Sequence, residues 1–179
     1  MEQELELSYY KDAAPINESH GIWLVQDQRS GKFYVRKTLT VFNKDIYRYL
    51  KSNPIHHTPK IHHVVEDGNT LVVIEDYIPG DTLEEILAWE GSMPEAQALD
   101  IATQLCKILQ AFHHAVPPIV NRDIKPSNIK LTAEWENRLS QVQQGRLEPE
   151  DFLDGIRGML TDLVRDYRPV SGADILFLV

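Results

Sequence analysis

Short apolar runs separated by polar turn residues fill the first 74 positions of the chain. Four runs have the length and the β-branched or aromatic content of strands: 22–25, 32–37, 61–65 and 70–74. Residues 27–31 and 66–69 carry Asp, Asn, Ser and Gly, which favour tight turns. The pattern therefore predicts two β-hairpins, preceded by a short acidic lead over residues 1–12.

Helical spacing interrupts the strand pattern between the two hairpins. Over residues 43–51 it places Ile46, Tyr49 and Leu50 on one side of a helix. The Ser-Asn-Pro sequence that ends at Pro54 cannot continue a helix, because proline lacks the backbone N–H. We therefore expect one short helix between the hairpins.

After the second hairpin the helical pattern takes over. A short helix is predicted over 82–89, with Asp81 or Thr82 as its N-cap. A long amphipathic helix is predicted from residue 94 to about residue 114. Its apolar stripe consists of Leu99, Ala102, Leu105, Leu109 and Phe112.

Beyond residue 131 the pattern predicts two further helices. The first runs to Gly145, and the second begins at Pro149. The stripe of the second consists of Phe152, Ile156, Met159, Leu160, Leu163, Val164 and Tyr167. The run 175–179 is apolar and strand-like. Strands followed by helices predict an α+β fold.

Composition narrows the class of protein. The chain has 179 residues, 42% hydrophobic and 25% charged, with 27 acidic against 18 basic residues and a net charge of −9. We expect neither nucleic acid nor an anionic membrane as a partner, since no basic block would attract them. The single cysteine, Cys106, suits a reducing cytoplasm. We expect no signal peptide, because the first residues are acidic and lack an apolar core, and no apolar run has membrane-spanning length.

Residues 119–128 read Ile-Val-Asn-Arg-Asp-Ile-Lys-Pro-Ser-Asn. This segment resembles the catalytic loop of protein kinases, H-R-D-x-K-x-x-N, with Asn121 in place of the histidine. The resemblance implies that Asp123 accepts the proton of the attacking hydroxyl, Lys125 neutralises the transferring phosphoryl group, and Asn128 binds Mg²⁺ and the nucleotide. The alternative is a solvated turn of mixed charge.

The resemblance to bacterial serine/threonine protein kinases covers about residues 8–131. It implies a kinase-like small lobe over about 8–78 and the start of a helical large lobe over about 79–131. The implied reaction is transfer of the ATP γ-phosphoryl group to Ser or Thr hydroxyls, with ATP and Mg²⁺ as cofactors. The protein substrate cannot be read from the sequence.

The resemblance also assigns a nucleotide site in the small lobe. Lys37 would contact the phosphates, the alternative being an ordinary surface lysine beside Arg36. Gly21 is the one glycine retained from the family's phosphate-covering loop, and the alternative there is a plain hairpin. Glu18 in that loop would repel phosphate.

An acidic residue on the helix after Lys37 should form an ion pair with it. That helix offers Asp45, or Ile46 under a slightly different alignment. Further along, Glu75, Asp76 and Tyr77 resemble the hinge, whose backbone groups would bind the adenine edge.

The second metal ligand of the family, an Asp-Phe-Gly motif, does not follow Asn128 at the expected spacing. Residues 151–153 read Asp-Phe-Leu, but they fall too late and inside a predicted helix. We therefore expect weak nucleotide binding at most and little turnover. The alternatives to an impaired kinase are a catalytically dead kinase-like binding module and a non-functional fusion fragment.

Residues 132–179 are predicted to form a helical tail of different origin. About residues 131–170 resemble a helical segment of bacterial type IA DNA topoisomerases, without the catalytic residues of that family. We infer no DNA cleavage from it.

A histidine-rich patch consists of His56, His57, His62 and His63. Imidazoles bind Zn²⁺, yet no cysteine lies nearby and neighbouring strand residues face opposite sides. Surface or packing histidines are therefore expected, with a metal site as the alternative.

Overall fold

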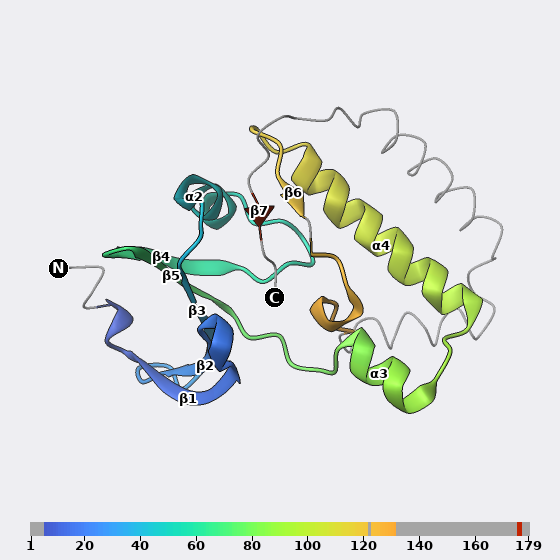
Figure 1. Cartoon of the computed structure of the whole chain (residues 1–179), viewed down its shortest axis with the longest axis horizontal. Helices are drawn as coiled ribbons and strands as arrows, with labels where there is room; N and C mark the ends of the chain where they lie inside the picture. The colour runs from blue at the N-terminus through green and yellow to red at the C-terminus, as the bar shows by residue number, and fades with distance from the viewer. Residues whose placement is uncertain (1–5, 122, 132–174, 177–179) are drawn as a thin grey trace. The chain divides into compact units, whose positions relative to one another are not determined.

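The computed structural model describes residues 6–121, 123–131 and 175–176. The chain divides into two compact units, Met1–Ile78 and Pro79–Val179. Figure 1 labels their elements in chain order. The five strands of an antiparallel sheet precede helices α3 and α4, so the predicted α+β class is confirmed. The two helices predicted after residue 131 lie outside the described residues.

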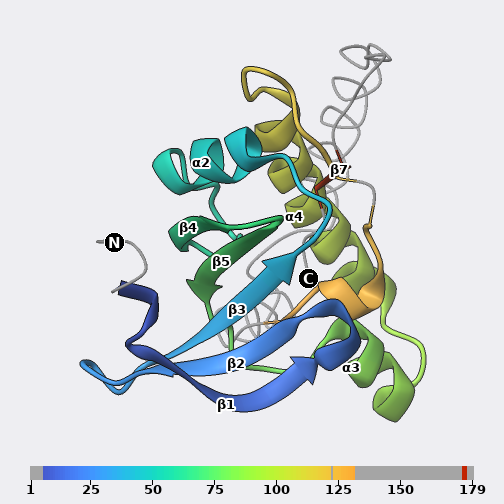
Figure 2. The ribbon, with the colours of Figure 1, turned by 60° about the vertical axis from the view of Figure 1, so that its left-hand side comes forward.

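The first unit is built on a five-stranded antiparallel sheet of order β1-β2-β3-β5-β4 (Figure 2). Its strands are β1 Tyr10–Asn17, β2 Ile22–Asp27, β3 Phe33–Leu39, β4 Ile61–Asp67 and β5 Thr70–Asp76. Both predicted hairpins are present, as the pairs β2–β3 and β4–β5. The sheet core includes the fully buried Val25, Leu71, Val73 and Ile74.

Strand β1 was not predicted, and part of it lies in the segment interpreted as an acidic lead. Tyr10 is its single buried residue, and the strand, which contains Pro15, lies at the edge of the sheet. A strand paired on one side and exposed along its length has no alternation of apolar and polar residues to reveal it. The Tyr10 ring joins β1 to the sheet, because it packs edge-on against the rings of Tyr34 and His63 at centroid distances of 5.4 and 5.6 Å.

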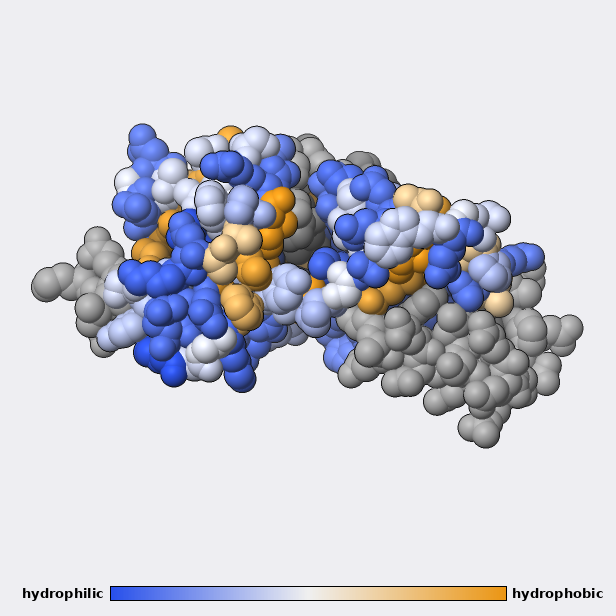
Figure 3. All heavy atoms as spheres, turned by 90° about the horizontal axis from the view of Figure 1, so that it is seen from below, coloured by the Kyte–Doolittle hydropathy of each residue, from blue (hydrophilic) through white to orange (hydrophobic). Residues whose placement is uncertain are grey.

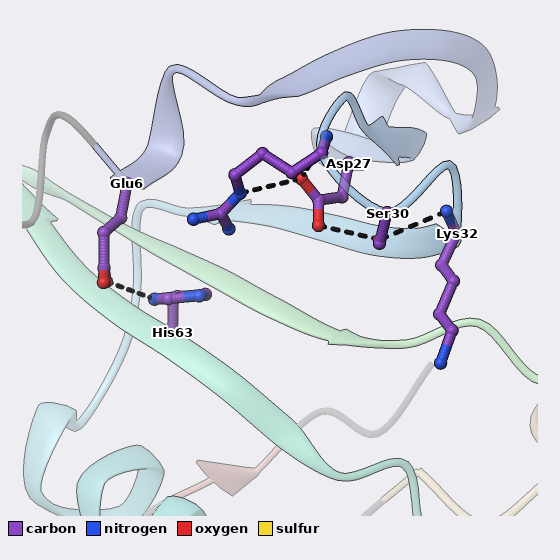
Figure 4. Close-up of polar contacts among 6 residues, drawn as sticks. Glu6, Asp27, Ser30, Lys32 and His63 are labelled. Atoms are coloured by element: carbon purple, nitrogen blue, oxygen red, sulfur yellow. Dashed lines mark hydrogen bonds and ion pairs between the residues drawn. The ribbon is translucent and has the colours of Figure 1, made fainter.

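Polar contacts hold the segment before β1 and the β2–β3 turn of this sheet (Figure 4). Glu6, just before β1, pairs with His63 of β4 at 3.0 Å. In the β2–β3 turn the Asp27 carboxylate accepts hydrogen bonds from the Arg29 N–H at 3.1 Å and from the Ser30 hydroxyl at 2.8 Å. The predicted turn residues thus form the turn through their side chains.

Helix α2, Lys44–Ser52, packs against β4. Asn43 caps it by accepting a hydrogen bond from the Asp45 N–H at 3.0 Å. Its buried side chains are Ile46, Tyr47 and Leu50. The predicted face included Tyr49 instead of Tyr47; that was wrong because the face turned to the sheet is rotated toward position 47, and Tyr49 is only half-buried.

The second unit contains the remaining elements. They are α3 Leu83–Glu90, α4 Glu95–His113, β6 Val120–Asn121, the 3₁₀ turn η2 Pro126–Asn128, and β7 Ile175–Leu176. Strand β7 pairs in parallel with β6, so the apolar run at the end of the sequence does contribute strand residues.

The sequence analysis predicted the N-cap of α3 and part of the buried face of α4. Thr82 is the cap of α3, since its hydroxyl accepts from the Glu85 N–H while Glu85 accepts from the Thr82 N–H, a complete capping box. In α4, Phe112 is buried as predicted, but Ala102 is exposed and Ile101 is buried instead. The buried residues of α4 are Asp100, Ile101, Thr103 and Phe112, whereas Leu99, Leu105 and Leu109 of the predicted stripe are only half-buried.

Large apolar side chains are exposed on separate segments of both units. They are Ile16, Phe33, Val41, Tyr77, Trp89, Val116 and Ile124. The face shown in Figure 3 has hydrophilic areas around smaller apolar ones. Scattered exposure of this kind is usual for a folded domain. Among the described residues, no helix combines the length and the apolar character needed to cross a bilayer.

Candidate nucleotide and catalytic sites

Lys37 lies in the middle of β3 with its side chain buried in the sheet unit. The side chain is 3% exposed, and its Nζ lies 2.6 Å from Oε1 of Glu75, whose side chain is 5% exposed. A buried ammonium requires a compensating charge or hydrogen bonds. The interpretation of Lys37 as an ordinary surface lysine is therefore wrong.

The strand register explains why Lys37 and Glu75 meet. Lys37 is opposite Val73 of β5, while Glu75 is opposite Val35 of β3. Side chains alternate along a strand, so Lys37 and Val35 point to one face and Val73 and Glu75 to that same face. Lys37 and Glu75 are thus diagonal neighbours, a separation that long side chains can bridge.

Burial and pairing act in opposite directions on Glu75. Burial raises the pKa of the Glu75 carboxyl, while the charge and hydrogen bond of Lys37 lower it and nearby Asp76 raises it further. Burial is the larger effect, so the pKa stays above its ordinary value. Lys37 is therefore the neighbour that favours the charged form of the Glu75 carboxyl inside the sheet.

The expected ion pair between Lys37 and helix α2 is wrong. The Asp45 side chain is 82% exposed, and its nearest cation is Arg48 of the same helix, at 4.0 Å. Ile46, the alternative position, is buried and apolar. The partner is Glu75, which the sequence analysis placed in the hinge.

The other expected hinge residues continue from the same strand. Glu75 and Asp76 are the last residues of β5, a strand paired on both sides. The Asp76 N–H donates to the carbonyl oxygen of Lys60 at 3.0 Å, and its carboxylate lies 2.7 Å from Nε2 of His62. Tyr77 follows, partly exposed, near the end of the first unit. Contact of these residues with adenine stays a prediction.

Gly21 occupies a position that requires glycine. It ends the 3₁₀ turn η1, Glu18–His20, with φ of +68°, and a Cβ there would lie 2.9 Å from the carbonyl oxygen of Thr38. Its own carbonyl oxygen accepts from the Thr38 N–H at 3.0 Å. Gly21 therefore joins the β1–β2 connection to β3, the strand of Lys37; its contact with phosphate stays a prediction.

The second candidate site is the loop between β6 and η2, where three predicted residues come together. The Asp123 carboxylate lies 3.0 Å from Nζ of Lys125, and the same oxygen accepts from Nδ2 of Asn128 at 2.9 Å. Asn128 also donates to the Asp123 carbonyl oxygen at 2.9 Å. Arg122 lies outside the described residues.

Asn121, the residue that replaces the family histidine, supports Asp123. Its side-chain oxygen accepts a hydrogen bond from the Asp123 N–H at 2.9 Å. The substitution thus retains a structural contact to the loop backbone. Three side chains thus contact Asp123, and the catalytic role of the loop stays a prediction.

The neighbours of Asp123 determine its charge. The hydrogen bond from Lys125 has the largest effect and lowers the pKa of Asp123. Burial, the next largest effect, raises it, but the hydrogen bond from Asn128 and the charge of Lys125 lower it further, so the pKa lies below its ordinary value. The carboxylate is therefore ionised at neutral pH. An ionised carboxylate can accept a proton from a hydroxyl within hydrogen-bond reach.

The exit of this loop is held by the segment before α3. The Leu83 N–H donates to the carbonyl oxygen of Ile129 at 2.8 Å, and Nζ of Lys130 donates to the carbonyl oxygen of Gly80 at 2.9 Å. Gly80 has φ of +110°, and a Cβ there would lie 2.9 Å from the carbonyl oxygen of Leu131. The sequence analysis missed this contact; the Pro-Gly-Asp sequence before α3 was its only local signal.

The histidines of the predicted patch have protein partners. His62 pairs with Asp76 and His63 with Glu6, while the rings of His56 and His57 lie edge-on at a centroid distance of 3.9 Å. Within the described part of the chain, no group of three or more His, Cys, Asp or Glu side chains is placed to hold a metal ion.

Comparison with known proteins gives the family. Residues 32–141 match the model of the protein kinase domain. The chain therefore belongs to the protein kinase domain family. The match continues beyond residue 131, where the sequence analysis expected a tail of different origin; that origin and the likeness to topoisomerases stay predictions.

Three relatives illustrate the similarity. A probable LRR receptor-like serine/threonine-protein kinase of Arabidopsis thaliana is 32% identical over 82 residues, 45% of this chain and 7% of the relative. A probable serine/threonine-protein kinase of Clostridium acetobutylicum is 38% identical over 72 residues, 40% of this chain and 11% of the relative. The mitogen-activated protein kinase kinase SIPKK of Nicotiana tabacum is 24% identical over 185 residues, 98% of this chain and 50% of the relative.

These relatives set the level of the comparison. The chain spans half or less of the length of each of them. They come from plants as well as from a bacterium, so the similarity extends beyond the bacterial kinases that the sequence analysis singled out. Kinase-like function is supported at the level of the family.

Proposed function

We propose that the chain binds ATP with Mg²⁺ and transfers the γ-phosphoryl group to Ser or Thr hydroxyls of a protein, with reduced turnover. The observation that carries the proposal is the convergence of Lys125 and Asn128 on the Asp123 carboxylate, at 3.0 and 2.9 Å. This arrangement keeps Asp123 ionised and aimed by three separate contacts. The protein substrate stays unassigned, and we expect the chain to act in the cytoplasm.

Each residue has one role in this proposal. Asp123 accepts the hydroxyl proton, Lys125 offsets charge on the transferring group, and Lys37 contacts the phosphates. The backbone groups of Glu75, Asp76 and Tyr77 border the adenine, and Gly21 lies in the connection that covers the phosphates. The family relation and the burial of Lys37 support these assignments.

The donor atoms of the loop are compatible with Mg²⁺. Asn128 directs its Nδ2 toward Asp123, so its side-chain oxygen is the atom that would hold the ion. Mg²⁺ prefers oxygen ligands such as carboxylates, amide oxygens and phosphates. When bound, Mg²⁺ neutralises phosphate charge. Because the sequence has no Asp-Phe-Gly motif after Asn128 at the family spacing, we expect turnover to be slow.

The first test is calorimetric titration of the full chain with ATP, with and without Mg²⁺. We expect ATP to bind and Mg²⁺ to strengthen binding. The variant Lys37→Met/Glu75→Leu removes both buried charges together, so it should retain the fold and lose the affinity for ATP. Absence of ATP binding by a folded wild-type chain would reject the proposal.

A phosphotransfer assay separates the enzyme from a kinase-like binding module. Incorporation of labelled γ-phosphate into a generic protein substrate should be slow and should disappear in Asp123→Asn. ATP binding without any incorporation would instead favour the binding module, the alternative that the missing Asp-Phe-Gly motif supports. Aggregation or non-cooperative melting would favour the fusion fragment.

A further inference from the structure

The buried ion pair of the sheet unit lies entirely within two neighbouring strands. Lys37 belongs to β3 and Glu75 to β5, and their Nζ and Oε1 atoms are 2.6 Å apart. Both side chains are almost completely buried. Because each residue is fixed by a paired strand, their separation is set by the register of the sheet.

Helix α2 contributes no charge to this pair. Its one acidic residue, Asp45, lies on the exposed side of the helix near Arg48. The inner side carries Tyr47, whose phenol is buried. Burial, and to a smaller extent the Glu75 carboxylate, raises the pKa of Tyr47 to about 12. Tyr47 therefore stays neutral and borders the pair without a counter-charge.

We propose that Glu75 is the positioning residue of the nucleotide lysine, so that Lys37 is held from within the sheet instead of by a carboxylate of α2. This inference rests on the proposed function, in which Lys37 contacts the phosphates. Displacement of α2 should then leave Lys37 in place, because the atoms that hold it are strand atoms.

Glu75 positions Lys37 and does not mask it. An ammonium group has three N–H donors, and the contact with Oε1 of Glu75 uses one of them. The carboxylate also offsets part of the cost of burying the ammonium. Loss of the Glu75 charge should therefore weaken phosphate binding, whereas a masking role would make its loss strengthen binding.

Calorimetry with ATP and with adenosine tests the inference on the full chain. In Glu75→Gln we expect ATP to bind about tenfold more weakly, a change of about 1.4 kcal/mol, with adenosine affinity unchanged. Adenosine lacks the phosphates that Lys37 contacts, so a general loss of structure would weaken both ligands. Asp45→Asn is the matched control and should change neither affinity.

Three outcomes of this titration would overturn the inference. They are tighter ATP binding by Glu75→Gln, an equal loss for ATP and adenosine, and an equal loss in Asp45→Asn. If Glu75→Gln does not fold, Glu75→Asp keeps the charge but shortens the side chain by one methylene. It should also weaken ATP binding while sparing adenosine.

A double-mutant cycle on unfolding tests the pair without nucleotide. The denaturation midpoints of Lys37→Met, Glu75→Leu and the double variant should be strongly non-additive, whereas Lys37→Met with Asp45→Asn should be additive. Additivity at Lys37 and Glu75 would overturn the inference. If the wild-type chain binds no ATP although the cycle shows coupling, the proposed function fails while the pairing itself holds.

Discussion

At the scale of single residues, Lys37 and Glu75 depend on each other inside the sheet. Each charge is buried, and each is compensated by the other at 2.6 Å. Removing one member of a buried pair leaves an uncompensated charge, which costs far more than removing both. A substitution of Lys37 or Glu75 that is made to test function therefore also lowers the stability of the fold.

We predict that Lys37→Met lowers the free energy of unfolding by about 3–5 kcal/mol at neutral pH. The double variant Lys37→Met/Glu75→Leu should recover most of this loss, because no buried charge remains. Urea denaturation at constant temperature measures both. A loss in Lys37→Met below about 1 kcal/mol would contradict the burial of the pair.

The same substitution should make stability depend on pH in a defined direction. Without Lys37 the pKa of Glu75 rises further, since burial then acts alone with Asp76. A carboxyl whose pKa is raised in the folded state binds more protons folded than unfolded, so stability falls as pH rises above its unfolded value of about 4.3. The deficit of Lys37→Met should thus be smaller at about pH 5 than at about pH 7.

The pKa of Asp123 is shifted in the opposite direction to that of Glu75. Its pKa is lowered, first by the hydrogen bond of Lys125 and then by Asn128. We predict that Lys125→Met raises the pKa of Asp123 toward its ordinary value, measured by the carboxyl carbon shift in an NMR titration. Lys107→Met, at an exposed position of α4, is the control and should leave it unchanged.

The stability linked to Asp123 follows from this direction. A lowered pKa adds stability that is present above the unfolded value of about 3.9 and is lost as pH falls through the folded value. Lys125→Met should therefore flatten the acid limb of the stability profile. An unchanged Asp123 titration in Lys125→Met would show that the pair at 3.0 Å does not persist in solution.

How far single residues could be predicted depends on how local their partners are. Asp123, Lys125 and Asn128 lie within six positions, so their spacing alone indicated that they act together. Glu75 is 38 positions from Lys37 (75 − 37), and the two meet only through the pairing of β3 with β5. No sequence pattern shows a strand register of that kind, so the partner was sought on the following helix.

At the scale of elements, helix α3 has an N-cap for which the sequence offers two candidate residues. The sequence offered Asp81 or Thr82 as the cap, and the structure uses Thr82 with Glu85. The hydrogen bonds from Thr82 lower the pKa of Glu85, which keeps its carboxylate charged at the positive end of the helix.

We predict that Thr82→Ala destabilises the chain by about 1 kcal/mol, because it removes the acceptor for the Glu85 N–H. Asp81→Ala is the matched control and should have a much smaller effect, since the capping side chain is that of Thr82. Urea denaturation compares the two. A larger loss of stability in Asp81→Ala would show that Asp81 caps the helix instead of Thr82.

The elements that were predicted share one property, and the missed one lacks it. Strands β2 to β5 and helices α2 and α4 bury side chains, and Leu83, Ile86 and Leu87 of α3 are half-buried, so the apolar residues of these elements recur with a period. Strand β1 buries only Tyr10 and is held by backbone pairing with β2. Backbone hydrogen bonds are available to any sequence, so they leave little trace in the pattern of side chains.

At the scale of the whole molecule, the proposed reaction needs groups from both compact units. Lys37 and Glu75 belong to Met1–Ile78, whereas Asp123, Lys125 and Asn128 belong to Pro79–Val179. The order of strands and helices, and with it the α+β class, followed from the sequence because it depends on local periodicity. Joint action of the two units on one nucleotide is part of the proposed function, and it can be measured.

The Mg²⁺ dependence of ATP binding is that measurement. We predict that Asn128→Ala loses the gain in ATP affinity that Mg²⁺ gives the wild-type chain and keeps its affinity without Mg²⁺, because the side-chain oxygen of Asn128 is the proposed metal ligand. Ser127→Ala, one residue earlier in η2, should retain the gain.

Combining Asn128→Ala with Glu75→Gln then tests whether both units act on one nucleotide. If they do, the two losses should be non-additive with Mg²⁺, since both changes weaken contacts to the same phosphates. Strict additivity would mean that the two units contribute independently, and an unchanged Mg²⁺ gain in Asn128→Ala would remove Asn128 from the metal site.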